Sequence, residues 1–184
     1  MNCTISYNGK VSIQVKNKPR RVSTNSGTPE LFNLLCRILA QHLTPYSETK
    51  FSGELPALID VLCCPDTTDS QLFLNDSTYK KYSQYSILTQ KAAIYSREVD
   101  NSVLKLTTIL NNSIMSSSYE TNLNNASFKT YIVLLDGNAE NILAVILVDS
   151  SFKDSLMSVG SDVNSQATIT WEMSFTNSYV EVNN

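Results

Sequence analysis

Glycine, proline, histidine and charged residues are all scarce in this chain of 184 residues. It has five glycines, five prolines and a single histidine, and 17% of its residues are charged, against roughly 25% in an average soluble domain. The few glycines and prolines exclude collagen-like repeats and architectures dominated by linkers. No apolar run approaches the ~18 residues that a membrane-spanning helix needs, so we expect no membrane partner.

Small uncharged polar residues are abundant instead, with 18 Asn, 25 Ser and 16 Thr. Hydrophobic residues make up 42% of the chain, which is enough for one domain with a sizeable core and too much for a wholly disordered chain. The formal net charge is −3 and the isoelectric point is near 5.1. A protein with this balance has no general attraction to nucleic acid, so we expect no nucleic-acid partner.

The four cysteines stand at positions 3, 36, 63 and 64, a spacing that fits no zinc-binding pattern. The first fifteen residues alternate between polar and apolar and do not form the apolar core of a signal peptide. We therefore expect no export by that route. The cysteines are predicted to be reduced, small core residues.

The first 27 residues predict a separate N-terminal unit. Cys3–Val15 is typical of a β-hairpin, because the dipeptide Asn8-Gly9 favours a tight turn with positive φ at both central positions. The polar stretch Lys16–Gly27 predicts a mobile loop. This loop carries the basic cluster, which consists of Lys16, Lys18, Arg20 and Arg21. We predict that residues 1–27 form a docking arm or a pair of edge strands.

An α-helix is predicted to begin at Pro29. Thr28 is a favourable N-cap, proline suits the first helical position, and Glu30 complements the positive end of the helix dipole. An apolar stripe with helical spacing follows, made of Leu31, Leu34, Leu35, Ile38, Leu39 and His42. Pro45 ends the helix. The position of His42 on this stripe favours a packed ring over a catalytic base.

The rest of the chain is predicted to be almost entirely β-structure. Apolar or alternating runs predict strands at Ala57–Cys64, Ala92–Val99, Ser102–Leu110, Phe128–Leu135, Ile142–Val148 and Ile169–Phe175. Phe128–Leu135 and Ile142–Val148 are nearly continuously apolar, which predicts burial on both faces by a second sheet, by the helix or by a neighbouring subunit. Residues 66–88 have no clear period and predict a long excursion or an irregular strand. Residues 28–184 thus predict a mainly β domain, an antiparallel β-sandwich of the immunoglobulin-like or jelly-roll-like kind with one N-terminal helix.

No motif predicts catalysis. A serine hydrolase would have to use His42, and no Gly-x-Ser-x-Gly turn accompanies it. The carboxylates Asp60, Asp136 and Glu172 have ordinary explanations as surface or turn residues, so a paired-carboxylate glycosidase site is not favoured. Glycine-rich phosphate loops and EF-hand spacing are absent from the sequence. We therefore predict a non-enzymatic protein without a cofactor or metal, and a small hydrolase is the least favoured alternative.

Tyr79, Tyr82 and Tyr85 recur at three-residue spacing; packing in the core or at an interface is the default interpretation, and an exposed aromatic stripe is the alternative. These tyrosines and the basic cluster are the candidate partner-binding residues. Contact of the tyrosines with a glycan receptor is an open alternative. Trp171 lies on the apolar face of its strand and is expected in the core.

Three segments carry a resemblance to a known family. They are residues 25–35 (NSGTPELFNLL), residues 131–138 and 142–145 (YIVLLDGN and ILAV), and residues 167–177 (ATITWEMSFTN). The first is similar to the starting helix, the second to a strand–turn–strand unit and the third to the closing strand of small tail, collar and fibre-associated proteins of tailed bacteriophages.

This resemblance implies a virion structural protein, a tail, collar or neck subunit that oligomerises and connects neighbouring virion proteins after synthesis in the bacterial host cytoplasm. Its implied partners are other copies of itself and other virion proteins. Independently of the resemblance, the apolar helix stripe and the two apolar strands predict a subunit interface, because surplus apolar surface is what a permanent interface requires. A carbohydrate-binding β-sandwich module for receptor recognition is the alternative reading.

Overall fold

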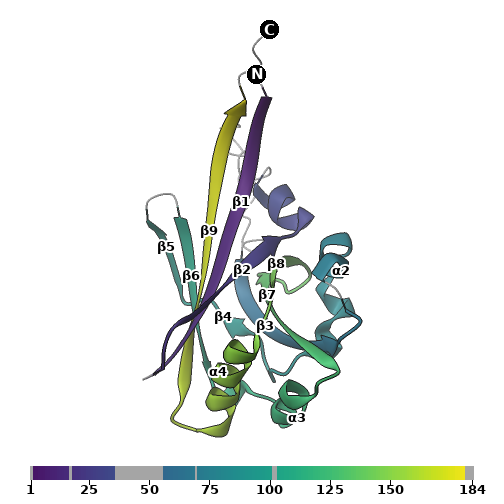
Figure 1. Ribbon diagram of the computed structural model, residues 1–184, viewed down its shortest axis with the longest axis vertical. Helices are drawn as coiled ribbons and strands as arrows, with labels where there is room; N and C mark the ends of the chain where they lie inside the picture. The colour runs from purple at the N-terminus through teal and green to yellow at the C-terminus, as the bar shows by residue number, and fades with distance from the viewer. Residues whose placement is uncertain (1, 17, 36–55, 69, 101–102, 181–184) are drawn as a thin grey trace.

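The computed structural model describes residues 2–16, 18–35, 56–68, 70–100 and 103–180. In these residues the strands form one antiparallel sheet in the order β4-β3-β7-β8-β2-β1-β9-β6-β5. The sheet is curled into a half-barrel (Figure 1). The mainly β prediction is confirmed, but the described chain has a single curled sheet where a sandwich requires two packed sheets.

The strands are β1 (Asn2–Val15), β2 (Arg21–Gly27), β3 (Pro56–Pro65), β4 (Ala92–Ala93), β5 (Ser96–Asp100), β6 (Val103–Asn111), β7 (Phe128–Asp136), β8 (Ile142–Leu147) and β9 (Gln166–Val180). The helices are α2 (Ser70–Asn75), α3 (Tyr119–Asn124) and α4 (Ser150–Ser161), and the 3-10 turns are η1 (Tyr79–Lys81), η2 (Ser83–Tyr85) and η3 (Asn112–Ile114). A further helix begins at Pro29 and is described over residues 29–35. The prediction of a single helix is therefore wrong.

The curl brings the two ends of the sheet together. β4 and β5 lie at opposite ends of the strand order, yet only Ile94 and Tyr95 separate them in the chain. The Ile94 N–H donates to the carbonyl of Ala57 in β3 (2.9 Å), and the Tyr95 N–H donates to the carbonyl of Thr107 in β6 (3.0 Å). One short segment thus bonds to strands from both ends of the sheet and holds the half-barrel closed on that side.

The predicted hairpin at Asn8-Gly9 is wrong. β1 runs without a turn from Asn2 to Val15 and pairs with β9 along this whole length. Gly9 is a strand residue at which a Cβ would overlap the side chain of Asn25 in the neighbouring β2. Its lack of a side chain therefore serves a close approach between strands and not a positive φ. The expected mobile loop also contains an ordered strand, since β2 pairs with β1 from Gly9 to Ile13.

The helix that begins at Pro29 confirms the prediction of its start. The Leu31 N–H donates to the backbone carbonyl of Thr28 (3.1 Å). The Thr28 hydroxyl is buried and does not cap the helix, because it donates to the carbonyls of Ile142 (2.6 Å) and Leu143 (3.0 Å). Thr28 therefore ties the start of the helix to β8. The predicted positions of Cys36, His42 and Pro45 lie outside the described residues.

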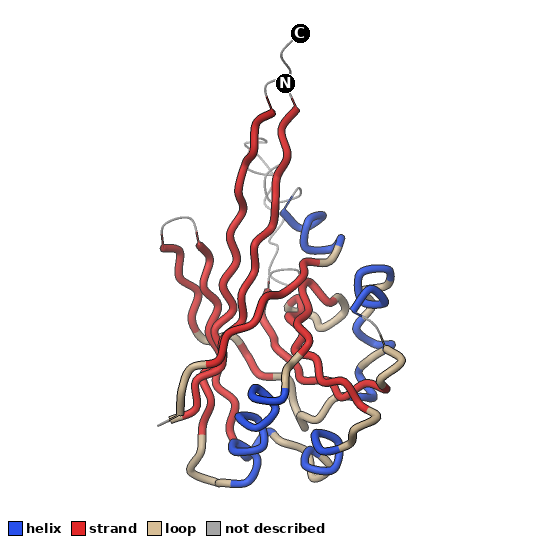
Figure 2. Tube along the Cα trace, viewed as in Figure 1, coloured by secondary structure: helices blue, strands red, loops and turns tan. Residues whose placement is uncertain are grey.

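The inner face of the sheet packs against α4, which contacts β1, β6 and β9 (Figure 2). Phe152, Leu156 and Val159 of α4 are buried in one hydrophobic cluster with Trp171 of β9. The core position expected for Trp171 is thus confirmed. The Asp149 side chain begins α4 by accepting a hydrogen bond from the Phe152 N–H (2.8 Å).

The outer face of β3, β7 and β8 is covered by the chain itself. Residues 66–88 form a long excursion that contains α2, η1 and η2, and Phe73 of α2 packs edge-on against Tyr131 of β7 with 5.0 Å between ring centroids. A second hydrophobic cluster joins these residues to Leu62 of β3 and Val145 of β8. Burial of β7 and β8 on both faces is therefore confirmed. The apolar surface attributed to a subunit interface is covered by the excursion and by α4.

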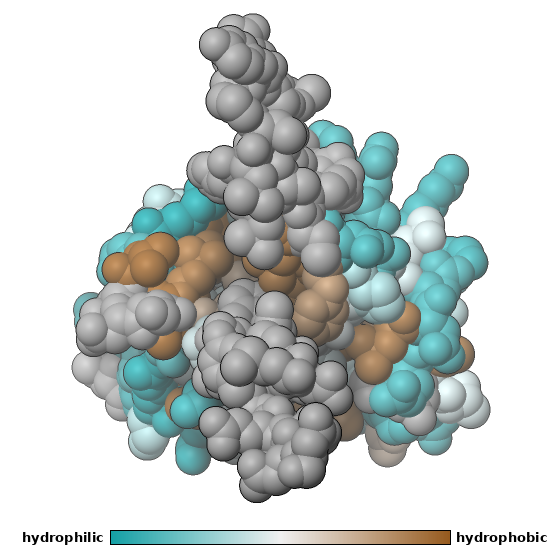
Figure 3. Space-filling view, turned by 90° about the horizontal axis from the view of Figure 1, so that it is seen from above, coloured by the Kyte–Doolittle hydropathy of each residue, from teal (hydrophilic) through white to brown (hydrophobic). Residues whose placement is uncertain are grey.

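Large hydrophobic side chains that remain exposed belong to different elements, among them Val22 of β2, Leu72 of α2 and Val99 of β5. Viewed from above, hydrophobic residues show beside hydrophilic ones (Figure 3). Cys63 and Cys64 are free and buried, as predicted for small core residues, and burial raises the pKa of the Cys64 thiol to about 12. The side chains of the other two cysteines lie outside the described residues.

Candidate functional site

A two-stranded ribbon projects from the body of the molecule. We call it the arm: the ends of β1 and β9 that are paired from Asn2↔Val180 to Tyr7↔Phe175. β2 pairs with β1 only over Gly9–Ile13, and β6 pairs with β9 only over Gln166–Ser174. In the described part of the chain, no third strand lies along the arm, which stands clear of the body in Figures 1 and 2.

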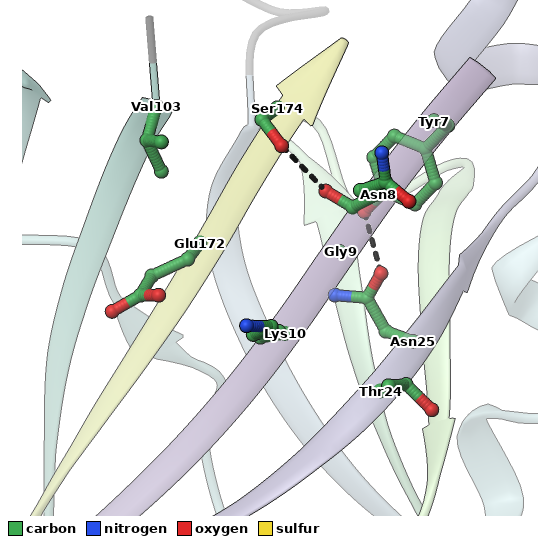
Figure 4. Close-up of a pocket in the computed structure, with 9 residues that line it drawn as sticks. All are labelled: Tyr7, Asn8, Gly9, Lys10, Thr24, Asn25, Val103, Glu172 and Ser174. Atoms are coloured by element: carbon green, nitrogen blue, oxygen red, sulfur yellow. Dashed lines mark hydrogen bonds between the residues drawn. The ribbon is translucent and has the colours of Figure 1, made fainter. Parts of the chain in front are cut away.

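A groove of about 240 Å³ lies at the base of the arm, where four strands meet (Figure 4). It is lined by Tyr7, Asn8, Gly9, Lys10, Thr24, Asn25, Val103, Glu172 and Ser174. The Tyr7 hydroxyl donates to Asn25 Oδ1 (2.6 Å), and the Ser174 hydroxyl donates to the carbonyl of Asn8 (3.5 Å). Burial raises the pKa of Tyr7 to about 12, although Trp171 and Asn25 oppose the shift. Tyr7 therefore stays a neutral hydrogen-bond donor that fixes the base of the arm to β2.

The basic cluster is exposed, as a partner-binding site requires. Two of its four side chains bond within the chain: Arg20 forms an ion pair with Glu172 (3.0 Å), and Lys18 donates to the hydroxyl of Ser158 on α4. Arg21 begins β2. The cluster thus joins two elements of its own chain, and its contact with a partner stays a prediction.

The interpretation of the three tyrosines as an exposed stripe is wrong. Tyr79 is 4% exposed, and Tyr82 and Tyr85 are half-buried. The Tyr82 ring packs on Phe73 with 4.5 Å between centroids, and its hydroxyl donates to the carbonyl of Asp76 (3.1 Å). The tyrosine rings are buried because the excursion packs them on the outer face of the sheet. These rings therefore form no platform for a sugar.

Asp60 is fully buried in β3 and not a surface residue. Its Oδ1 accepts hydrogen bonds from the Ser86 hydroxyl (2.6 Å) and the Val61 N–H (2.7 Å), and its Oδ2 accepts one from the Tyr79 hydroxyl (2.5 Å). Burial raises the pKa of Asp60, while these donors and the charge of Lys91 oppose the shift. The carboxyl group thus anchors two points of the excursion to the sheet.

A cavity of about 570 Å³ lies beside this network, and we call it the Tyr79 cavity. Its lining comes from the excursion, from Lys91 and from the loop between β7 and β8: Thr78, Tyr79, Lys80, Ser83, Lys91, Ala139, Glu140 and Asn141. The ammonium of Lys91 stands 4.8 Å from the centroid of the Tyr79 ring. Such a cation–π contact fixes a lysine that would otherwise be free to move.

Asp136 shapes the loop that lines the cavity and is buried, although the sequence suggested a simple turn residue. Its carboxylate accepts the Glu140 N–H (2.9 Å) and the side-chain amide of Asn141 (2.8 Å). Ala139 has φ of 55°, a left-handed conformation that is uncommon outside glycine. The hydrogen bonds to Asp136 and the left-handed backbone at Ala139 therefore determine the shape of the β7–β8 loop where it lines the cavity.

The other candidates have structural partners or lie outside the description. Glu172 pairs with Arg20, and Asp76 pairs with Lys81, which together with Thr78 lowers the pKa of Asp76 to about 2. His42 lies outside the described residues. In the part of the chain that the structure describes, no group of three or more His, Cys, Asp or Glu is placed to hold a metal ion. Of the helices described, none has the length and apolarity to cross a membrane.

No protein-family model, curated protein or solved structure matches this chain. The site residues missed by sequence reasoning are those that converge on Asp60. One signal was present, because Asp60 interrupts the apolar run Ala57–Cys64, and a carboxylate in such a run must find buried partners. Its partners Tyr79 and Ser86 follow in an aperiodic segment, so their positions were not predictable from spacing.

Proposed function

We propose that this chain is a non-enzymatic structural subunit of a tailed-phage virion, in the tail, collar or neck, that assembles with other copies of itself and with neighbouring virion proteins. The observation that carries the proposal is the arm. The resemblance of the three sequence segments supports the choice of family. Virion location and synthesis in the bacterial host cytoplasm are part of the same proposal.

The arm supports assembly because a two-stranded ribbon is marginally stable in water by itself. Its outer edges carry backbone N–H and C=O groups, which bind readily to the edge of another strand. In the described residues no third strand occupies these edges. A neighbouring subunit that adds a strand there stabilises the ribbon and joins two copies through backbone hydrogen bonds.

We propose that the arm contacts the next copy head-to-tail, which gives a ring, whereas an arm-to-arm contact would give a two-fold dimer. In the described chain the two ends of the sheet offer further strand edges, because β5 pairs with β6 alone and β4 pairs with β3 alone. An arm that binds a different surface of the next copy makes a head-to-tail contact, and such contacts close into rings when the rotation allows. A collar or neck subunit needs this kind of contact.

The carboxylates considered for catalysis support the non-enzymatic assignment through their partners. Glu172 pairs with Arg20, Asp136 holds its loop, and Asp60 is enclosed by three donors. The alternative of a carbohydrate-binding module is disfavoured because Tyr82 and Tyr85 are half-buried. Recognition of a glycan receptor by these rings has no observation in its favour.

Negative-stain electron microscopy of the purified chain tests the proposal. We expect closed rings or another symmetric assembly at micromolar concentration, with the arm at the contact between neighbouring subunits. Isolated particles of a single chain across the same range, with no higher species, would contradict a ring-forming subunit.

A further inference from the structure

The Tyr79 cavity has walls that are held in place before any ligand arrives. The Tyr79 N–H donates to the carbonyl of Glu140 (2.8 Å), and the Ile142 N–H donates to the carbonyl of Ser77 (2.7 Å). Thr78 and Asn141 form an isolated β-bridge between the same two segments. These bonds join the excursion to the β7–β8 loop. A preformed cavity binds ligands with a smaller loss of conformational entropy.

Three energetically costly features converge on this cavity. The floor residue Tyr79 bonds to the buried carboxyl of Asp60, the wall residue Ala139 has a left-handed backbone, and the buried Asp136 positions Glu140. A buried carboxylate and a non-glycine residue with positive φ each cost free energy. Their concentration around one cavity is typical of a binding site.

The charges and hydrogen-bonding groups of the lining define the ligand. Lys80 and Lys91 contribute two cations from different segments, and Glu140 contributes one anion. Within the described ranges neither lysine forms an ion pair with a carboxylate. Ser83 and Asn141 add a hydroxyl and an amide. Two lysines match an anionic group, whereas a carboxylate, a hydroxyl and an amide match ligand hydroxyls.

We propose that the Tyr79 cavity binds a small organic anion that also carries hydroxyl groups. The anionic group lies between Lys80 and Lys91, and the hydroxyls reach Glu140 and Asn141. An acidic sugar and a sugar-like phosphate share this chemistry. The cavity volume of about 570 Å³ is in the range of small-molecule sites. This inference is independent of assembly through the arm.

Amide chemical shifts of the isotope-labelled intact chain test the inference. Four probes are titrated: D-glucuronate, glycerol phosphate, neutral glucose and acetate. We expect saturable shifts at Lys80, Lys91 and Asn141 with glucuronate or glycerol phosphate, at concentrations below about 10 mM, since small ligands in open cavities bind weakly. Binding of glucose and acetate is expected to be at least about tenfold weaker, because each lacks one of the two recognised groups.

The matched variants are Lys80→Met with Lys91→Met, which keep the apolar stems, and Lys16→Met, an exposed lysine of the basic cluster. The double variant is expected to bind at least about tenfold more weakly, while Lys16→Met binds as the unmodified chain does. Because Lys80 is exposed, Lys80→Met alone keeps the test informative if the double variant fails to fold. Absence of saturable shifts, equal binding of acetate, or unchanged binding by the lysine variants would overturn the inference.

Discussion

At the scale of single residues, buried carboxylates connect the excursion and the loops to the sheet. Asp60 accepts hydrogen bonds from Tyr79, Ser86 and Val61, and Asp136 accepts them from the β7–β8 loop. The sequence predicted that both were ordinary surface or turn residues. A carboxylate can be buried only where hydrogen-bond donors from distant segments contact it, and no local sequence pattern predicts such donors. The core roles of Trp171, Cys63 and Cys64 were predictable because apolar runs record burial directly.

Replacing Asp60 by Asn tests its role as an anchor. An Asn amide keeps the size of the side chain and the acceptor oxygen that bonds to Ser86 and Val61, but it presents an N–H donor where Asp60 Oδ2 accepts from the Tyr79 hydroxyl. We expect the free energy of unfolding to fall by about 2–4 kcal/mol, because a buried donor loses its acceptor. Urea denaturation measures the change. The control Asp66→Asn, at an exposed turn, should change stability by less than ~0.5 kcal/mol, and equal effects of the two substitutions would contradict the anchor role.

The wild type and the Asp60→Asn variant also test the raised pKa of Asp60. In the unfolded chain Asp60 has the ordinary aspartate pKa of 3.8, whereas the folded chain holds the Asp60 proton at higher pH. Between these two pKa values, lowering the pH stabilises a folded chain that contains the carboxyl group. We expect the stability advantage of the wild type over Asp60→Asn to widen as pH falls from neutrality toward about 4. Denaturation at a series of pH values measures it, and a narrowing difference would show that the pKa is lowered.

At the scale of elements, strands were more predictable than helices. β7 and β8 were identified with their buried faces, because their apolar runs of five residues (Tyr131–Leu135) and seven residues (Ile142–Val148) leave little alternative. The sequence did not predict α4, because serines interrupt its apolar spacing. The signals of this helix are the N-cap Asp149 and the helical spacing of Phe152, Leu156 and Val159. The hairpin at Asn8-Gly9 was wrong because a favourable turn dipeptide was outweighed by pairing of β1 with β9 along its whole length.

The excursion is an element whose cover over the sheet is testable. Phe73 is fully buried against Tyr131 and Tyr82, whereas its neighbour Leu72 on α2 is 46% exposed. We expect Phe73→Ala to lower the free energy of unfolding by about 3–5 kcal/mol, because it leaves a cavity beside β7. Leu72→Ala should cost less than about 1 kcal/mol. Chemical denaturation compares them, and similar costs would mean that the excursion does not seal the outer face.

At the scale of the whole molecule, the body buries its own apolar faces, whereas no third strand covers the edges of the arm in the described residues. The excursion and α4 bury the apolar faces that a neighbouring subunit was expected to cover. We therefore propose that assembly uses the backbone edges of the arm. No sequence pattern predicted the arm, because the register of β1 with β9 joins residues from opposite ends of the chain. The prediction that residues 1–27 dock a partner is compatible with it, since β1 supplies half of the arm.

The mass of the native assembly, measured by sedimentation velocity for the intact chain and for one arm variant, tests the central claim most directly. The variant Thr4→Pro with Ile5→Pro removes two backbone N–H groups of the arm. The control Thr4→Ser with Ile5→Val retains both N–H groups. We expect the intact chain and the control to sediment as multimers at micromolar concentration, and the proline variant to sediment as a folded monomer. An intact chain that remains monomeric, or a proline variant that assembles as fully as the control, would contradict assembly through the arm.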